Sequence, residues 1–427
     1  MTEKIVIIDG VRTPFMRANG AAGELMPDDL GAFVVKELAA RASFPLDEID
    51  ELIFGNVLQL PQTLNIARVI SVKGGLSEKI PAVTINRNCA SGMEAIAEAA
   101  NKLLLGQARV IFAGGTESMS HYPILYKKSL SQFFLGWKKA KNWRQKLSRI
   151  LPLRPSDFLP ESPVIADPLS GLLMGQTAEI LARDFMITRE EQDLFSLHSH
   201  QRAINAAKDN IFFDEIIPIP LPPNFSSIQL ADDGPRSNST LSALAALPPA
   251  FEPITGTVTA GNSSQVTDGA AGLVLTTESY AKRLGIKPLG SIKAYSSIGL
   301  APERMGLGPY FATAKVLRET GLHLRDFDLV EINEAFAVQV LAVLKAFSSA
   351  EVARRLLGLD AALGELNPDI VNVNGGAIAL GHPLGASGAR LVLTLLKELI
   401  RRKKKRGLAT LCVGGGQGLS LIVEVEE

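Results

Sequence analysis

Residues 386–416 read ASGARLVLTLLKELIRRKKKRGLATLCVGGG, and residues 90–115 read ASGMEAIAEAANKLLLGQARVIFAGG. Each stretch begins with Ala-Ser-Gly, continues through a helical pattern of apolar residues and then enters a short apolar run typical of a buried strand. Each ends in consecutive glycines, and the helix-to-glycine spacing differs by only four residues between the two. This shared order of elements predicts an internal duplication, and therefore two similar halves.

The remaining periodicity extends this pattern along the chain. Apolar runs typical of buried strands are separated by longer segments with helical periodicity, which favours an α/β fold. In the two duplicated stretches we expect helices over Met93–Leu105 and from Ala389 to about Arg402, and strands over Arg109–Ala113, ending at Gly114-Gly115, and Gly407–Val413. Three further apolar runs look like buried strands: 329–332, 370–373 and 419–424.

Composition excludes several classes of protein. At 427 residues the chain is long for one core and suits two or three domains. Lysine plus arginine equals aspartate plus glutamate, at 44 each, so the net charge predicts no nucleic acid partner. The one strongly basic run, residues 401–406, closes a predicted helix, where cations suit the negative end of the helix dipole.

Cysteine and histidine are scarce. Two cysteines exclude a disulfide scaffold and any Cys-rich metal site, and they fit a reducing compartment. His198-x-His200 has no acidic or cysteine companion at metal-ligand spacing, so we expect it on a helix surface and predict no metal. The chain starts almost at once as a strand, without a signal peptide or an apolar run of membrane-spanning length. We therefore expect a cytoplasmic protein.

Cys89 follows the strand-like Ala82–Asn86 and opens the helix of residues 91–105. A thiol at a helix N-terminus feels the positive end of the helix dipole, which lowers its pKa and favours the reactive thiolate. The alternative is a buried cysteine that acts as a small hydrophobic residue. Position alone does not decide between the two.

Three other segments carry candidate site residues. Cys412 ends a predicted strand before Gly414-Gly415-Gly416, whose N–H groups could face an oxyanion, although position alone favours a packed strand residue. His382 lies in a glycine-rich loop before a helix, where it could act as a general base. Asn333 follows the run 329–332 and is either a helix cap or a site residue at a strand end.

Together these segments resemble the thiolase family. The resemblance rests on the block around Cys89 and on five further motifs: Arg12-Thr13-Pro14-Phe15, 256–264, Asn333-Glu334-Ala335-Phe336, Gly381-His382-Pro383 and 412–416. It implies an α/β thiolase fold in which two duplicated halves, each with a five-stranded sheet, form a five-layer αβαβα core. The halves would be residues 1–120 with 251–280 and residues 281–427, with a loop domain, residues 121–250, over the active site.

The resemblance also implies a mechanism. Cys89 is the nucleophile and His382 takes its proton. Attack on a 3-ketoacyl-CoA gives acyl-Cys89 and the enolate of acetyl-CoA, which Cys412 protonates. His382 and a water held by Asn333 form one oxyanion hole, and the N–H groups of Cys89 and Gly414 form the other.

The same resemblance implies the ligands and the rival functions. Coenzyme A is a substrate rather than a bound cofactor, and Ser264 and Arg236 match positions that hold it. The function implied is reversible thiolytic cleavage, with a homodimer or homotetramer expected. A ketoacyl synthase is disfavoured by Cys412, and a non-catalytic acyl-CoA or lipid carrier is disfavoured because every catalytic position is filled.

The sequence gives mixed indications of acyl chain length. Insertions at 122–165 and about 347–367 are similar to those in β-subunits of the trifunctional enzymes of fatty-acid β-oxidation. The region 372–390 looks like the short-chain biosynthetic type, yet Leu173 stands where those enzymes commonly have histidine. Both a β-oxidation thiolase and an acetoacetyl-CoA thiolase (acetyl-CoA acetyltransferase) therefore remain open.

Residues 126–154 carry nine lysines and arginines and no acid. Leu130, Phe134 and Trp137 recur at helical spacing, which predicts one or two basic amphipathic helices. Such helices suit a membrane surface, giving a peripheral protein, or a β-oxidation partner subunit. The alternative is a solvated basic face whose aromatic side chains pack on the loop domain, and a third role is to steer the phosphates of coenzyme A.

Overall fold

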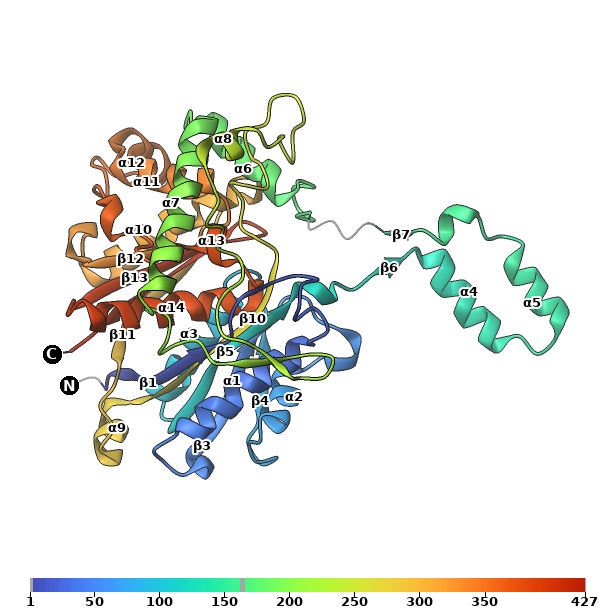
Figure 1. The fold of residues 1–427 in the computed structure, drawn as a ribbon, viewed down its shortest axis with the longest axis horizontal. Helices are drawn as coiled ribbons and strands as arrows, with labels where there is room; N and C mark the ends of the chain where they lie inside the picture. The colour runs from blue at the N-terminus through green and yellow to red at the C-terminus, as the bar shows by residue number, and fades with distance from the viewer. Residues whose placement is uncertain (1–2, 162–165, 427) are drawn as a thin grey trace. The chain divides into compact units, whose positions relative to one another are not determined.

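A computed structural model of the chain describes residues 3–161 and 166–426. The chain divides into two compact units. Residues 1–121 and 167–427 make up the core unit, and residues 122–166 make up the basic unit. Figure 1 shows the helices and strands of each.

The core unit is built on a sheet of ten strands, in the order β12-β13-β14-β11-β1-β10-β5-β3-β4, with the short β2 paired to β10. The strands of the first half are β1 (Ile5–Arg12), β2 (Met16–Arg17), β3 (Ile49–Gly55), β4 (Ala82–Ile85), β5 (Val110–Ser118) and β10 (Thr267–Thr277). Those of the second half are β11 (Gly290–Gly299), β12 (Leu329–Ile332), β13 (Arg406–Val413) and β14 (Gln417–Glu424).

The two halves repeat one topology except at the outer edge. The expectation of a five-stranded sheet in each half is wrong for the second half, which has four strands among the described residues and no counterpart of β4. In the first half β3 lies parallel to both β4 and β5, and β5, β10 and β1 follow antiparallel to one another. In the second half β12 lies parallel to β13, and β13, β14 and β11 follow antiparallel. The pairing of β1 with β11, where Ile5 faces Ile292, joins the halves into one sheet.

Helices cover both faces of this sheet in each half. The first half contributes α1 (Pro27–Arg41), α2 (Ile66–Lys73), α3 (Ser91–Leu104) and α9 (Glu278–Leu284). The second half contributes α10 (Gly308–Thr320), α11 (Ala337–Ser348), α12 (Ala350–Leu357), α13 (Ala377–Leu380) and α14 (Leu384–Arg401). Three more precede β10: α6 (Met174–Asp184), α7 (Arg189–Lys208) and α8 (Leu241–Ala245), with the small pair β8 (Ile219–Leu221) and β9 (Ser227–Gln229).

The expected αβαβα layers are confirmed. One apolar cluster joins α3 and α14 to strands of both halves, so these two helices form the central layer. A second cluster packs α1 and α2 on the other face of the first-half strands, and a third packs α10 and α11 on the other face of the second-half strands. Because both duplicated helices lie in the shared layer, their N-termini lie inside the core unit.

Close packing of α3 on α14 depends on the glycines of the Ala-Ser-Gly repeats. A Cβ on Gly92 would lie 2.6 Å from the carbonyl oxygen of Gly385, and one on Gly388 would lie 2.5 Å from the backbone nitrogen of Met93. The two copies of the Ala-Ser-Gly repeat therefore form the contact between α3 and α14.

Two strand predictions are wrong. The strand predicted to end at Gly114-Gly115 continues to Ser118, because these glycines permit close approach within the sheet: a Cβ on Gly114 would lie 2.1 Å from the oxygen of Ala271. The run 370–373 is no strand. In this run only Val371 forms a backbone bridge, to Val330, and Asn372 has a φ of 47°, which no strand residue adopts. The Asn372 side-chain amide takes the place of backbone pairing: its oxygen accepts from the Ile332 N–H at 2.8 Å and its nitrogen donates to the Ile332 carbonyl at 2.9 Å.

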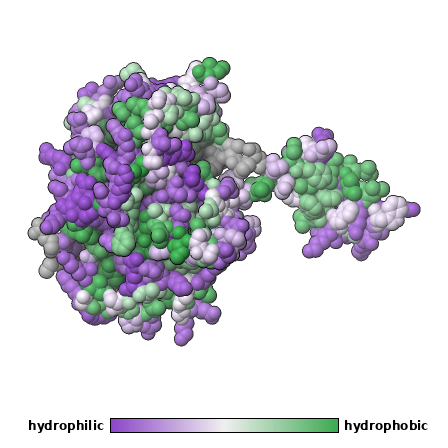
Figure 2. Space-filling view, viewed as in Figure 1, coloured by the Kyte–Doolittle hydropathy of each residue, from purple (hydrophilic) through white to green (hydrophobic). Residues whose placement is uncertain are grey.

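The basic unit contains the two helices that the sequence predicts, α4 (Lys128–Lys139) and α5 (Trp143–Ile150), and the short strands β6 (Leu125–Tyr126) and β7 (Pro160–Glu161). Leu130 is buried, and the rings of Phe133 and Trp137 lie 5.5 Å apart between centroids. Figure 2 shows hydrophobic side chains on the surface of this unit.

Candidate active site

Cys89 lies in a tight turn between β4 and α3. Asn88 adopts the left-handed conformation, with a φ of 45°, and the Ser91 hydroxyl closes the turn by accepting from the Arg87 N–H at 2.9 Å and donating to the Asn88 carbonyl at 2.7 Å. The same turn is joined to the glycine loop that follows β13, because the Asn88 side-chain amide donates to the Gly414 carbonyl at 2.8 Å. These contacts hold Cys89 beside that loop.

The expectation that the helix dipole lowers the pKa of Cys89 is wrong. Burial raises the pKa of its thiol, and the negative charge of Glu117 adds to this. The N–H groups of Gly414 and of Cys89 itself act in the opposite direction but do not outweigh burial. The resting side chain is therefore a thiol, and it needs a base to become a nucleophile.

Cys412 is buried at the end of β13, where it pairs with Gly418. Burial raises the pKa of its thiol strongly, and the neighbouring Cys89 raises it further. The structure thus brings both cysteines of the chain to one place. A thiol held so firmly in its protonated form suits a proton donor better than a nucleophile.

His382 lies between Gly381, whose φ is 105°, and the start of α14. Its Nδ1 is 2.6 Å from the hydroxyl of Ser387, and that hydroxyl donates to the Pro383 carbonyl at 2.9 Å. Because the hydroxyl proton is used there, Ser387 accepts from Nδ1–H, and Nε2 is the unprotonated nitrogen. Burial and the cation of Arg390 lower the pKa of His382 to about 3, so the ring is neutral at physiological pH.

Asn333 joins this arrangement directly. Its side-chain amide nitrogen is 3.3 Å from Nε2 of His382, and its backbone N–H bonds to the Thr410 carbonyl at 3.0 Å. Its Oδ1 is buried and has no hydrogen-bond partner in residues 3–161 and 166–426. Interpretation as a helix cap is wrong, because α11 begins only at Ala337 and its N-cap position is Phe336, three residues after Asn333.

No hydrogen bond joins Cys89 to His382 in the described part of the chain. The two are nevertheless carried to one place, because the N-termini of α3 and α14 meet at Gly92 and Gly385. The structure therefore gathers the Cys89 turn, the glycine loop and the histidine–asparagine pair around the central layer.

Ser264 borders this cluster, because the next residue, Gln265, accepts from the His382 N–H at 3.1 Å. Arg236 lines a cavity of about 230 Å³ together with His200, Leu244, Leu247, Gly261 and Gln265. Ser264 follows Gly261 on the same loop, and its N–H bonds to the Ala335 carbonyl at 2.9 Å, two residues beyond Asn333. One loop thus leads from the cavity to the catalytic cluster.

The prediction that His198 and His200 share a helix surface is wrong for His200. His200 is buried, and its Nδ1 accepts from the Arg236 N–H at 3.2 Å. Burial and the Arg236 cation lower the pKa of His200 to about 4, so it is neutral and holds the cavity wall. No group of three metal-ligating side chains occurs in the described ranges 3–161 and 166–426.

Sequence reasoning missed two residues that support the site. Ser387 has a sequence signal, since it lies in the first turn of the helix that follows His382. Glu117, at the end of β5, accepts from the N–H groups of Val57, Leu58 and Gly385 at 3.0 to 3.1 Å, which ties β5 to the start of α14. Burial raises the pKa of Glu117 to about 7 against the effect of these donors.

A buried ion pair lies behind His382. Arg390 Nη1 and the Glu331 carboxylate are 2.8 Å apart, and both side chains are almost fully buried. Arg390 lies one turn after Ser387 on α14. Glu331 lies on β12, two residues before Asn333, which follows the end of that strand. The pair therefore links the same two elements that hold the imidazole.

Comparisons with known proteins agree with this geometry. The family model described as Thiolase, N-terminal domain matches residues 5–279, and that described as Thiolase, C-terminal domain matches residues 286–425. A 3-ketoacyl-CoA thiolase of Photorhabdus laumondii is 42% identical over 425 residues, covering 99% of this chain and 97% of that protein. One of Yersinia pestis is 41% identical over 426 residues, with the same coverage.

Solved structures give the same answer. The acetyl-CoA acetyltransferase of Bacillus anthracis has a TM-score of 0.84 at 37% identity, covering 99% of each chain. Human mitochondrial 3-ketoacyl-CoA thiolase in complex with CoA has a TM-score of 0.84 at 35% identity, covering 100% of this chain and 99% of that one. The chain belongs to the thiolase family.

Proposed function

We propose that the protein catalyses the reversible, CoA-dependent thiolytic cleavage of a 3-ketoacyl-CoA into acetyl-CoA and a shortened acyl-CoA. The observation that carries this proposal is the state of His382. Ser387 keeps the Nδ1 proton in place, so Nε2 of a neutral imidazole is available as a base beside a cysteine that rests as a thiol.

In the first half-reaction His382 Nε2 takes the Cys89 proton, and the sulfur attacks the keto carbon. The N–H groups of Cys89 and Gly414 stabilise the resulting oxyanion, and one such donor contributes about 3–4 kcal/mol in other enzymes. Cleavage of the carbon–carbon bond leaves acyl-Cys89 and the enolate of acetyl-CoA. Cys412 donates its proton to the enolate carbon, while protonated His382 and a water held by Asn333 stabilise the enolate oxygen.

In the second half-reaction the thiol of coenzyme A gives its proton to the Cys412 thiolate and attacks acyl-Cys89. The same two N–H groups stabilise the second tetrahedral intermediate. Cys89 leaves and recovers its proton from His382, which returns every group to its starting state. In the reverse direction Cys412 removes the α-proton of acetyl-CoA.

Coenzyme A is proposed to enter along the loop that joins the Arg236 cavity to Ser264. Arg236 lines the cavity, and its cationic side chain suits the nucleotide phosphates; Ser264 lies between the cavity and Asn333, where the pantetheine would pass. The CoA complex of the human mitochondrial relative supports coenzyme A as the ligand of this chain.

We infer a β-oxidation role from the names of the curated relatives and from one apolar side chain beside the glycine loop. Met174, at the start of α6, lies with its sulfur 3.4 Å from the position a Cβ would take on Gly414, and Leu173 precedes it. The Bacillus anthracis neighbour favours the alternative, an acetoacetyl-CoA thiolase. Rates on 3-ketoacyl-CoAs of four to sixteen carbons decide this: kcat/KM that rises with length supports β-oxidation, and activity confined to acetoacetyl-CoA contradicts it.

We infer that the basic unit binds an anionic membrane surface, which would place a cytoplasmic enzyme at the membrane periphery. On α5 the exposed side chains of Trp143, Leu147 and Ile150 recur at helical spacing among Arg144, Lys146 and Arg149. This is the pattern of a helix that lies in a membrane interface. In the described residues, no helix is both long enough and apolar enough to cross a bilayer.

Sedimentation with vesicles tests the membrane proposal. The full chain should sediment with anionic vesicles at low salt and not with neutral ones, and Trp143→Ser with Leu147→Ser should abolish this. Leu104→Ser with Leu105→Ser, two exposed leucines of the core unit, is the matched control. Unchanged sedimentation of the Trp143 variant, or of a chain lacking residues 126–154, would exclude the membrane and leave a partner subunit or packing within the protein.

We also propose a homodimer or homotetramer. The outer edge of the sheet supports self-association: β4 is the last strand of the sheet, and Val83 on it is exposed. Light scattering on the purified chain measures the mass directly, and a monomeric mass would contradict this proposal.

A further inference from the structure

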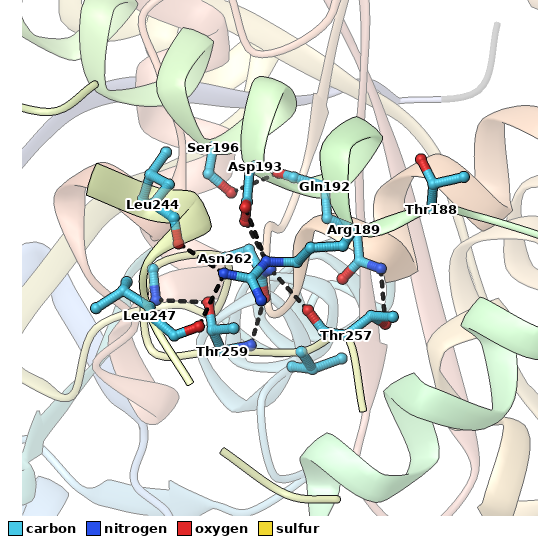
Figure 3. Close-up of polar contacts among 12 residues, drawn as sticks. Thr188, Arg189, Gln192, Asp193, Ser196, Leu244, Leu247, Thr257, Thr259 and Asn262 are labelled. Atoms are coloured by element: carbon cyan, nitrogen blue, oxygen red, sulfur yellow. Dashed lines mark hydrogen bonds and ion pairs between the residues drawn. The ribbon is translucent and has the colours of Figure 1, made fainter. Parts of the chain in front are cut away.

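Arg189, the first residue of α7, connects three segments that are distant in sequence. Its Nε bonds to the Asp193 carboxylate at 2.7 Å, and its Nη2 donates to the carbonyls of Leu244 and Leu247 at 2.6 and 3.0 Å (Figure 3). Those carbonyls lie at the end of the five-residue helix α8 and just after it. A helix so short is not stable alone, so these two bonds fix where α8 lies.

The second oxygen of Asp193 extends the connection. It accepts from the Asn262 side-chain amide at 3.0 Å, and the same amide donates to the Thr257 carbonyl at 3.1 Å. The Asn262 Oδ1 accepts from the Thr259 N–H at 2.8 Å (Figure 3). Asp193 and Asn262 are both buried. Arg189, Asp193 and Asn262 are called the Arg189 clasp below.

The clasp joins two walls of the cavity that Arg236 lines. One wall is formed by Leu244 and Leu247 of the α8 segment, and the other by Gly261. The walls touch: a Cβ on Gly261 would lie 2.6 Å from Leu247 Cδ1 and 2.7 Å from Leu244 Cδ2. The clasp holds Gly261 against Leu244 and Leu247, and this contact sets the width of the cavity.

The clasp is also connected to the start of α11. The Asn262 carbonyl accepts from the Ala337 N–H at 2.9 Å, and Ser264 bonds to Ala335 on the same segment as Asn333. Among the described residues, no hydrogen bond or ion pair joins the clasp to the two cysteines or to His382. The clasp can thus affect the reaction only through the position of this loop and of α8.

We propose that Arg189, Asp193 and Asn262 are positioning residues for coenzyme A, which preorganise the cavity for its nucleotide end. This inference rests on the proposed function, because it places the nucleotide at Arg236. Without the clasp, α8 and the loop of residues 257–264 must be ordered by the ligand, and that ordering lowers affinity. The chemistry at Cys89 is unaffected.

Isothermal titration of the full-length enzyme with coenzyme A is the primary test. Arg189→Met should raise the Kd for coenzyme A by on the order of tenfold, and Arg189→Lys, which keeps the cation beside Asp193, should raise it less. The matched control is Arg183→Met, since Arg183 makes an exposed ion pair with Glu252 outside the clasp. If Arg189→Met does not fold, Arg189→Lys carries the test, and a wild-type Kd for the variant that folds would overturn the proposal.

Kinetics with a truncated substrate separate positioning from general support. On 3-ketoacyl-CoA, Arg189→Met should raise KM with kcat nearly unchanged. On the N-acetylcysteamine thioester of the same acyl group, which lacks the nucleotide, the variant should match wild type. Equal loss on both substrates would overturn the positioning role. A wild-type enzyme that cleaves neither substrate, yet binds coenzyme A more tightly than Arg189→Met, would reject the proposed function and keep the clasp.

Discussion

Replacing Ser387 by alanine tests how the imidazole of His382 is made into a base. The Nδ1–H of His382 donates to the Ser387 hydroxyl at 2.6 Å, and both residues are buried. Alanine leaves this donor unpaired, which costs about 1–3 kcal/mol in a buried site. The cost is greatest when the ring is charged, as it becomes during attack by Cys89. The acylation rate should therefore fall about 5- to 150-fold, while KM changes little.

The assay is rapid-quench measurement of acyl-Cys89 formation by mass spectrometry. Ser71→Ala is the matched control, because the Ser71 hydroxyl is also buried in a helix and has no hydrogen-bond partner in the described residues. Thermal denaturation of both variants separates loss of fold from loss of rate. A Ser387→Ala enzyme that acylates at the wild-type rate would show that the tautomer is not set by this hydroxyl.

Three further predictions concern the same cluster. Burial, and after it the Arg390 cation, lower the pKa of the imidazole to about 3. The double variant Arg390→Met with Glu331→Leu removes the cation, so it should raise this pKa and move the acid limb of the pH profile of acylation to higher pH; an unmoved limb in a folded enzyme would contradict this. Cys412→Ala should slow α-proton exchange of acetyl-CoA by at least about a hundredfold and acylation by less, and unchanged exchange would remove its acid–base role. Gly388→Ala should destabilise the fold by about 1–3 kcal/mol in chemical denaturation, whereas Gly299→Ala, whose Cβ would lie 4.0 Å from the Gly416 carbonyl oxygen in ordinary contact, should not.

The positions of the site residues were predictable because each chemical group follows a strand or opens a helix. Cys89, His382, Asn333 and Gly414 all lie in loops at element ends, where period and glycine content indicate a turn. The duplicated Ala-Ser-Gly stretches likewise predicted the repeated topology. The spacing of Leu130, Phe134 and Trp137 predicted one or two helices in the basic unit, and these three residues all lie on α4.

What the sequence could not predict depends on partners from distant segments. The pKa of Cys89 is governed by burial and by Glu117, neither of which is visible beside the helix start. The strand around Gly114 continues because its glycines face Ala271 and Gly385, and these contacts exist only in the folded sheet. The Arg189 clasp is a third case, since its segments converge only through the packing of α7.

The central claim is that Cys89 carries the acyl group. Incubation with a 3-ketoacyl-CoA in the absence of free coenzyme A, followed by intact mass and peptide mapping, measures this directly. The enzyme should gain the mass of the shortened acyl group on the peptide that contains Cys89, and Cys89→Ser should neither gain it nor turn substrate over. An adduct on Cys412 alone, or a Cys89→Ser enzyme that still cleaves substrate, would contradict the account.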